Sequence, residues 1–295
     1  MAREVTALRI AMIGGDRRAV LLAKRLAEDG NRVRSFALEK AESVPRVYRA
    51  GCLQGCVYGA EIVVLPIPAE RGGVLNAPYS DARIPISDVM AALWQGQIVC
   101  GGALGREVHA MALQNSLTEI DLTERESFAL ANAFLTAEGA AECLTSLSDR
   151  AIWGSSALVV GWGRVGKAAA RTLSAMGAAV AVAARKASDR AEAAMCGCAA
   201  VETGAISAVI DGFDFIVNTV PARVITNAAL ERVPEGSVVL ELASAPGGFD
   251  RAYAEKLGVR AASAPGLPGR YAPRSAAELM AEEIYAIASE LETGE

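Results

Sequence analysis

The chain has 295 residues and a formal net charge of −5, with 52% hydrophobic and only 5% aromatic residues. Its length predicts about two domains, and an acidic balance without a basic stripe argues against a general nucleic-acid or anionic-membrane surface. Residues 1–10 lack the apolar core of a signal peptide and no apolar run approaches the ~18–20 residues that span a bilayer, so we expect a cytoplasmic protein.

Apolar strand patterns alternate with helical ones in the first part of the chain. Strands are expected at residues 8–15, 32–38, 61–68 and 97–102, and helices at 19–30 and 84–96. Alternation of this kind predicts a parallel sheet covered by helices. We therefore expect an N-terminal α/β domain over residues 1–126, which forms the substrate side of the molecule.

A connecting helix is expected next, over residues 127–150, interrupted by Gly139. The strand–helix rhythm then resumes in a second domain at residues 151–270. Its strands are expected at 157–161, 178–183, 214–220, 237–243 and 259–264.

The last segment, residues 271–295, reads as a helix with an apolar stripe. The stripe comprises Ala276, Leu279, Met280, Ile284 and Ile287, and it needs a partner, for which the first domain is the natural candidate. The predicted fold class is therefore α/β, with two Rossmann-like, doubly wound parallel-sheet domains joined by a long connecting helix.

A glycine-rich turn, GWGRVG at residues 161–166, follows a predicted strand and opens a predicted helix. Gly161 permits a tight turn, Gly163 lets the backbone approach a pyrophosphate, and Gly166 allows close packing of helix and strand. The predicted cofactor contacts here are Gly161, Trp162, Gly163, Arg164, Val165 and Gly166. The alternative is a glycine turn that serves packing alone.

The second strand of this domain ends in Ala184, Arg185 and Lys186. An NAD site usually carries Asp or Glu near this position for the ribose 2′-hydroxyl. A carboxylate would repel a 2′-phosphate, whereas a guanidinium can bind it in a bidentate manner. These three residues favour NADP over NAD, the alternative being a solvated loop.

Two further strand ends should face the same crevice. One carries Asn218, Thr219, Val220 and Pro221 and the other carries Ala243 and Ser244, all of which we predict to contact the cofactor.

The chain resembles the dipicolinate synthase A-subunit family. The resemblance lies in residues 240–280, with APGLPGRYAP and ASAPGG as its most specific blocks, and extends to NTVP, GWGRVG, the connector at 124–139 and IAMIGGDRR at 10–18. It implies NADP-dependent oxidation of dihydrodipicolinate or 4-hydroxy-tetrahydrodipicolinate to dipicolinate in spore-forming bacteria. It also implies a flavoprotein-like B subunit, and we expect a homo-oligomer. A related two-domain plan occurs in alanine dehydrogenase.

Two other functions stay open at this point. One is an NADP dehydrogenase of another small carboxylate, and the other is a non-catalytic NADP-binding subunit that supports a partner. Residues that suit a dicarboxylate on both sides of an interdomain cleft favour the enzyme.

Candidate substrate residues occur in three places. Arg18 could hold a carboxylate, with Asp16 organising its turn, unless it merely begins a solvated helix. Thr136 could bond a carboxylate and Glu138 could act as acid or base if burial favours its protonated form, unless they belong to a helix kink. The stretch containing Gly266, Leu267, Pro268, Gly269, Arg274 and Ser275 could offer amides and a cation to an anion, unless it is a rigid elbow.

The remaining reactive residues suggest little chemistry. The six cysteines lack zinc-ligand spacing and are expected to be reduced and mostly buried, and no metal site is predicted. His109 is expected to be a surface or packing residue of a helix.

Overall fold

The computed structural model describes residues 7–293, and of the side chains those up to residue 291. Residues 1–6, part of the stretch in which no signal peptide is expected, lie outside the described residues. The chain divides into two compact units, one formed by Met1–Ala129 with Ala272–Glu295 and the other by Leu130–Tyr271. The boundary between Ala129 and Leu130 falls within the predicted connector, so most of that segment belongs to the second unit.

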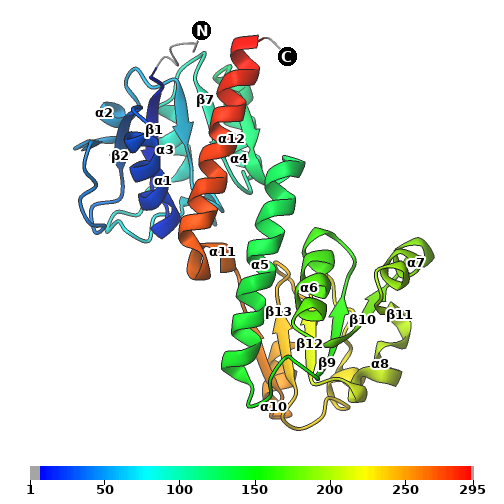
Figure 1. Cartoon of the computed structure of the whole chain (residues 1–295). Coiled ribbons are helices and arrows are strands. Elements are labelled where there is room, and N and C mark those ends of the chain that lie inside the picture. The colour runs from blue at the N-terminus through cyan, green and yellow to red at the C-terminus, as the bar shows by residue number, and fades with distance from the viewer. Residues whose placement is uncertain (1–6, 294–295) are drawn as a thin grey trace. The chain divides into compact units, whose positions relative to one another are not determined.

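Unit 1 is built on a parallel six-stranded sheet among the residues described (Figure 1). The strands in spatial order are β3 (Val47–Arg49), β2 (Arg32–Phe36), β1 (Arg9–Ile13), β4 (Ile62–Val64), β7 (Ile98–Gly101) and β8 (Thr118–Asp121). The central strands are buried on both faces, which is why they read as continuous apolar runs. A two-stranded hairpin of β5 (Glu70–Arg71) and β6 (Val74–Leu75) follows β4.

Helices cover both faces of this sheet. One face packs against α1 (Arg17–Glu28) and α12 (Pro273–Thr293), and the other against α2 (Leu53–Val57), α3 (Ile86–Ala91) and α4 (Arg106–Gln114). The apolar stripe of the last helix lies in the first of these cores, where Met280, Ile284 and Ile287 are buried with Leu22 and Leu26 of α1.

Unit 2 repeats the plan with a second parallel six-stranded sheet in the described chain (Figure 1). Its strands in spatial order are β11 (Ala199–Glu202), β10 (Ala179–Ala184), β9 (Ser156–Val160), β12 (Phe215–Asn218), β13 (Val238–Glu241) and β14 (Arg260–Ser263). Alternate residues of β9 face opposite cores, with Ala157 and Val159 on one side and Leu158 and Val160 on the other.

One face of this sheet packs against α5 (Glu126–Leu147), α6 (Arg164–Ala175), α7 (Ala187–Met195) and α11 (Leu267–Tyr271), and the other against α8 (Ile206–Val209), α9 (Asn227–Leu230) and α10 (Arg251–Lys256). The helix α5 is continuous through Gly139, so the expected interruption is wrong. A Cβ at Gly139 would lie 2.9 Å from Cβ of Leu267, so the glycine provides the close approach of α11 to α5.

Both sheets follow the doubly wound order 3-2-1-4-5-6 when the strands of each sheet are numbered along the chain. The α/β fold class with two Rossmann-like sheets is therefore confirmed. In such sheets ligands bind beyond the carboxyl ends of the strands where the order reverses, between β1 and β4 in unit 1 and between β9 and β12 in unit 2. Within residues 7–293 no helix combines the length and the apolar character needed to cross a bilayer.

Candidate functional site

The glycine-rich turn lies at the carboxyl end of β9, at the switch point of unit 2. Gly161 has φ +105°, and a Cβ there would lie 2.4 Å from Oγ1 of Thr219 on the neighbouring strand. A Cβ at Gly166 would lie 2.2 Å from the carbonyl oxygen of Gly161. Both positions therefore require glycine for geometric reasons, as the turn chemistry predicts.

Gly163 has the opposite surroundings. It is the N-cap of α6, no side chain caps the helix there, and a Cβ at this position would meet nothing within 4 Å. The first amides of a helix have no partner within the helix, and they carry the positive end of its dipole. The turn therefore fits a pyrophosphate, which would approach the exposed backbone at Gly163.

Trp162 contributes to this turn only through its backbone. Its side chain is buried in the core of unit 2, and Nζ of Lys167 lies 5.8 Å from its ring centre. Arg164 is exposed at the first position of α6, while Val165 is half-buried against the core.

The end of β10 presents cations to solvent. Ala184 is buried, whereas Arg185 and Lys186 are exposed between the strand and α7. The guanidinium of Arg190 donates to the carbonyl oxygens of Ala184 and Arg185, at 2.9 and 2.8 Å, and so holds this turn. A carboxylate does occur one strand away, because Glu202 of β11 is the register partner of Ala184.

Asn218 has a different role from the predicted one. It is fully buried, and its amide donates to the carbonyl oxygen of Val220 and to Oε1 of Glu241, the latter at 2.6 Å. Glu241 also accepts from the amides of Ala243 and Gly248, at 3.0 and 2.6 Å. The Asn218 side chain is thus engaged in holding the loop after β13, and direct contact with a cofactor is the wrong expectation for it.

Thr219 packs against the glycine turn. Its hydroxyl donates to the carbonyl oxygen of Val160 at 2.8 Å, directly under Gly161. Val220 is half-buried, and Pro221 and Ser244 are exposed beyond the strand ends. Cofactor contact by these last residues stays a prediction.

At the switch point of unit 1, Asp16 and Arg18 form a partly buried ion pair. Asp16 is the N-cap of α1 and accepts from the amide of Arg18 at 2.9 Å. The Arg18 guanidinium donates to both carboxylate oxygens of Asp16, with Nη2 at 2.8 Å, and also to the carbonyl oxygen of Ile67. The Arg18 side chain is 8% exposed and the Asp16 side chain 33%.

This pair borders a hollow between β1 and β4 with about 10 Å³ of free space, which is room for about one water molecule. A dicarboxylate is too large for this space, so the Arg18 side chain serves to hold the turn and does not offer an open anion site.

The two residues predicted for acid–base chemistry lie on α5. Thr136 donates its hydroxyl to the carbonyl oxygen of Asn132 at 2.8 Å, a bond within the helix. Glu138 is exposed, so the burial that its predicted role assumes is absent.

The predicted substrate loop contains the short helix α11. Leu267, Pro268 and Gly269 are buried, and Leu267 packs in the core of unit 2, so none of the three presents a surface to a ligand. Gly266 is exposed and has φ +67°. At the end of α11, Sγ of Cys143 lies 3.3 Å from the Tyr271 hydroxyl, and hydrogen bonding with Cys143 and Glu142 raises the Tyr271 pKa above its ordinary value.

Arg274 and Ser275 belong to the first turn of α12 in unit 1. Both are exposed, and Nε of Arg274 donates to Glu278 at 3.1 Å within the same helix. Of the six residues predicted to contact substrate here, Gly266, Arg274 and Ser275 are exposed to solvent.

The cysteines and the histidine serve the fold. Cys56, Cys100, Cys143 and Cys198 are buried, while Cys52 caps α2. Nδ1 of His109 lies 2.8 Å from Oε2 of Glu119 on the surface of unit 1, as expected for a surface residue. In residues 7–293, no group of three His, Cys, Asp or Glu side chains could hold a metal ion.

Three residues that support the site were missed from the sequence. Glu241 and Gly248 form the hydrogen-bonded support of the loop after β13, and Arg190 holds the turn after β10. Arg190 lies one helical turn beyond the predicted cations, so its charge was visible, but its orientation toward the backbone was not.

Comparison with known proteins matches each unit to a domain family. Residues 9–123 match the N-terminal domain of the dipicolinate synthase A-subunit, and residues 132–259 match the NAD binding domain of S-adenosyl-L-homocysteine hydrolase. The second match agrees with the glycine turn, so unit 2 carries a domain of the type that binds a nicotinamide dinucleotide.

Whole-chain relatives agree with the N-terminal match. The dipicolinate synthase A-subunit of Bacillus subtilis is 28% identical over 99% of both chains, and its crystal structure gives a TM-score of 0.86. The corresponding structure from Bacillus halodurans is 27% identical, covers 95% of this chain and 97% of its own, and gives 0.85. L-alanine dehydrogenase, 13% identical, covers 96% of this chain and 90% of its own with a TM-score of 0.64, so it shares the fold. The chain therefore resembles the A-subunit of dipicolinate synthase from one end to the other.

Proposed function

We propose that this chain is an NADP-dependent oxidoreductase that forms dipicolinate from dihydrodipicolinate, or from 4-hydroxy-tetrahydrodipicolinate after loss of water. The similarity to the dipicolinate synthase A-subunit over 99% of the chain carries this proposal. The uncapped N-terminus of α6 supports it, because that helix end suits the pyrophosphate of a nicotinamide dinucleotide.

NADP is favoured over NAD by charge. The strand β10 ends without a carboxylate, and Arg185 and Lys186 are exposed where a 2′-phosphate would lie in this fold. Arg190 fixes the backbone of that turn, which limits the freedom that the two cations lose on binding. Glu202, on the adjacent strand β11, contributes one negative charge near these two cations.

The reaction removes one hydride and one proton from the ring of the dihydro compound and leaves an aromatic pyridine. When bound, NADP+ supplies the hydride acceptor. Aromatisation supplies much of the driving force, so the chain has mainly to bind and orient its substrate. Five of the predicted substrate residues remain candidates. Glu138, Gly266, Arg274 and Ser275 are exposed, and the hydroxyl of Thr136 is bonded only within its own helix. We assign Asp16 and Arg18 the positioning of the first turn of unit 1.

Association and location extend the proposal. The relatives are named as one kind of subunit of their enzyme, which supports a second, flavoprotein-like subunit for this chain too. We further propose a homo-oligomer that works in the cytoplasm during sporulation.

The test is a reconstituted assay. Purified protein is mixed with freshly prepared 4-hydroxy-tetrahydrodipicolinate and either NADP+ or NAD+, and dipicolinate and reduced cofactor are measured together by chromatography. We expect equal amounts of both products with NADP+ and much slower turnover with NAD+. Cofactor reduction without dipicolinate would mean that the chain oxidises this compound to a different product, and would overturn the proposed reaction.

A second candidate is a cofactor-binding subunit that requires its partner for chemistry. The observation that favours it is the state of α5, where Thr136 is bonded within its helix and Glu138 is exposed. Tight NADP binding without turnover, followed by turnover when the second subunit is added, would select this candidate.

A further inference from the structure

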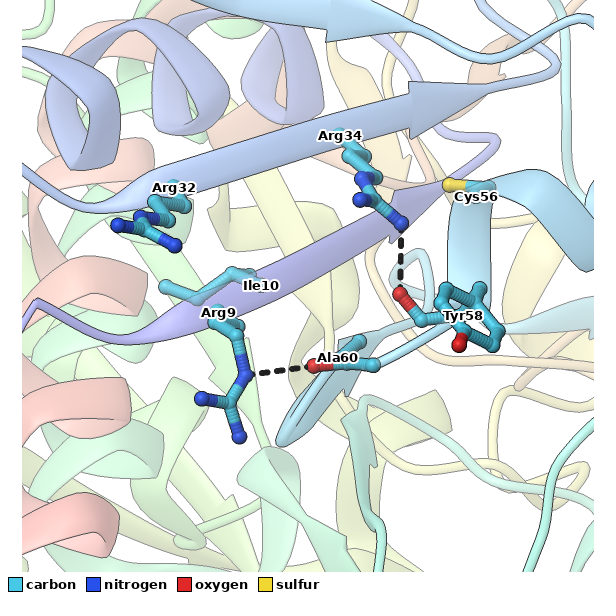
Figure 2. Close-up of a pocket in the computed structure, with 8 residues that line it drawn as sticks. Arg9, Ile10, Arg32, Arg34, Cys56, Tyr58 and Ala60 are labelled. Carbon is cyan, nitrogen blue, oxygen red and sulfur yellow. Dashed lines mark hydrogen bonds between the residues drawn. The ribbon is translucent and has the colours of Figure 1, made fainter.

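A cluster of arginines lies at the amino edge of the unit 1 sheet, at the end opposite to the switch point. Arg9 begins β1, Arg32 begins β2, and Arg34 follows two residues later (Figure 2). Arg9 and Arg32 are register partners on adjacent parallel strands. Because residues two apart in a strand share a face, all three side chains leave the same face of the sheet.

These side chains line a pocket of about 260 Å³ together with Ile10, Cys56 and the loop from Tyr58 to Ala60. The lining contains three guanidinium groups and no carboxylate. Burial raises the pKa of the Cys56 thiol to about 12, although Arg34 opposes this shift, so the thiol is neutral near pH 7 and forms part of the apolar floor. We call this site the arginine pocket.

Two of the three guanidinium groups are held in place by the backbone. Nε of Arg9 donates to the carbonyl oxygen of Gly59 at 2.7 Å, and Nη1 of Arg34 donates to that of Tyr58 at 2.6 Å (Figure 2). Outside the pocket lining, Glu61 forms an ion pair with Arg9 at 3.0 Å. The anchoring fixes two charges and their remaining N–H groups in advance of any ligand.

Arg32 is the exception. It is exposed, and no side chain in residues 7–291 pairs with its guanidinium. Placing it beside Arg9 and Arg34 sets like charges at neighbouring strand positions, which costs folding free energy. Backbone carbonyl oxygens satisfy part of Arg9 and Arg34, and Glu61 neutralises Arg9, but no carboxylate of the described side chains pairs with Arg32 or Arg34. The excess positive charge is therefore better explained by an anionic ligand than by stability.

A second hollow adjoins the pocket and shares Arg32, Arg34 and Tyr58 with it. It extends to Arg46 and to Tyr48, whose side chain is largely exposed. The combined space is concave and of ligand size, so it suits a small molecule better than a polymer.

We propose that the arginine pocket binds a small molecule with two acidic groups, either carboxylates or phosphates. Guanidinium groups bind both kinds of oxyanion in a bidentate manner. The site lies at the amino edge of the first sheet, whereas the dinucleotide turn lies at the carboxyl edge of the second. The observations behind the arginine pocket all lie within unit 1, so this proposal does not rest on the proposed function.

Calorimetric titration of the full chain with pyrophosphate and, separately, with malonate tests the proposal, in the presence of saturating NADP+. We expect one saturable site for at least one probe, and the preferred probe identifies the acidic group. Arg32→Glu should weaken that binding at least tenfold, and Arg32→Lys less, because a lysine keeps the charge but loses the planar fork. Arg106→Glu, at an exposed arginine of the same unit, should leave it unchanged.

Thermal unfolding provides a readout that does not depend on cofactor binding. The preferred probe should raise the Tm of the wild type and of Arg106→Glu but not that of Arg32→Glu, which loses no contact of the fold. No saturable binding of either probe, or equal affinity in Arg32→Glu and Arg106→Glu, would overturn the proposal. A failed dipicolinate assay would leave these results untouched.

Discussion

The first turns of the two units differ although their sheets share one strand order. Each turn follows the central strand, after Ile13 or Val160, and leads into a helix of 12 residues. Residues 14–19, GGDRRA, therefore correspond position by position to residues 161–166, GWGRVG. In this correspondence the N-cap is Asp16 in unit 1 and Gly163 in unit 2.

The difference at the N-cap decides what each helix end can bind. The Asp16 carboxylate accepts from the Arg18 amide and places a negative charge at the helix N-terminus, which satisfies the amides and repels an anion. Gly163 leaves the corresponding amides open and allows a ligand to approach the backbone. The same topology thus gives a helix end that is capped by a carboxylate in unit 1 and uncapped in unit 2.

The largest effect is expected from making the second turn like the first. Gly163→Asp should weaken NADP binding about a thousandfold, because two charge-assisted hydrogen bonds of about 1.5–3 kcal/mol each are lost. The backbone at Gly163 has φ −83°, which suits aspartate, so the fold should keep or slightly gain stability from the new cap. Calorimetric titration with NADP+ and chemical denaturation measure the two quantities.

Gly163→Asn is the matched control, since asparagine caps a helix without adding a charge. It should weaken binding less than aspartate does. Equal binding by the wild type and Gly163→Asp would show that the open N-terminus of α6 has no part in holding the cofactor.

The converse change in unit 1 should affect stability instead. Asp16→Ala removes the cap of α1 and leaves the largely buried Arg18 guanidinium without its carboxylate, which should lower the free energy of unfolding by about 3 kcal/mol. Denaturant unfolding measures this. Glu28→Ala, which removes an exposed ion pair with Lys24 on the same helix, should cost less than about 0.5 kcal/mol. Similar losses in the two variants would contradict a structural role for the Asp16–Arg18 pair.

Sequence patterns identified the central strands of both units and the edge strand β14, but missed the edge strands β3, β8 and β11. β1, β4, β9, β12 and β13 are buried runs of apolar residues, which is the signal that a pattern search detects. The strands β3, β8 and β11 are short, contain no fully buried residue and are polar in part, so they carry little hydrophobic signal. Such a segment adopts an extended conformation because its backbone pairs with the neighbouring strand.

The site shows the same division between local and distant causes. The positive φ of Gly161 and the close approach of Gly166 to the Gly161 carbonyl oxygen follow from a local turn, which the sequence predicts. Asn218 was misread because its partner Glu241 lies 23 residues further along, on the adjacent strand. Gly139 was misread for the same reason, since the residue that packs on it, Leu267, comes from a helix near the other end of the unit.

A smaller effect is expected at the end of β10, where we propose that Arg185 and Lys186 favour NADP over NAD. The double variant Arg185→Asp/Lys186→Ala should reduce the preference for NADP+ over NAD+ by ten- to a hundredfold, because it replaces two cations near the 2′-phosphate with one carboxylate. The ratio of kcat/KM for the two cofactors, or of their Kd values, measures the change. Arg251→Asp/Lys256→Ala on α10 makes the same charge change elsewhere in unit 2 and should leave the ratio as it is. An unchanged ratio in the first variant would mean that these cations form only a solvated loop.

The smallest effect concerns a second pair of equivalent positions. The residue before the fourth strand is Glu61 in unit 1 and Asp214 in unit 2, and each carboxylate accepts from the first amide of the central strand, at 2.9 Å from Arg9 or Ser156. Burial alone would raise the pKa of Asp214, but the bonds from the amide and hydroxyl of Ser156, with Arg150 nearby, hold that pKa below its usual value.

A lowered folded-state pKa means that Asp214 stabilises the fold above its unfolded pKa of about 3.9, and that this contribution is lost as the pH falls through the folded value. Asp214→Asn should therefore lower the denaturation midpoint at pH 7, and its difference from the wild type should shrink toward zero on acidification. Ser156→Ala removes the hydroxyl donor, so in this background Asp214→Asn should lower the denaturation midpoint at pH 7 by less than it does in the wild type. The loss of stability in the double variant should therefore be smaller than the sum of the two single losses, because both changes remove a shared interaction. A difference that stays constant down to the lowest pH at which the chain is folded would rule out this carboxylate as a source of acid sensitivity in unit 2.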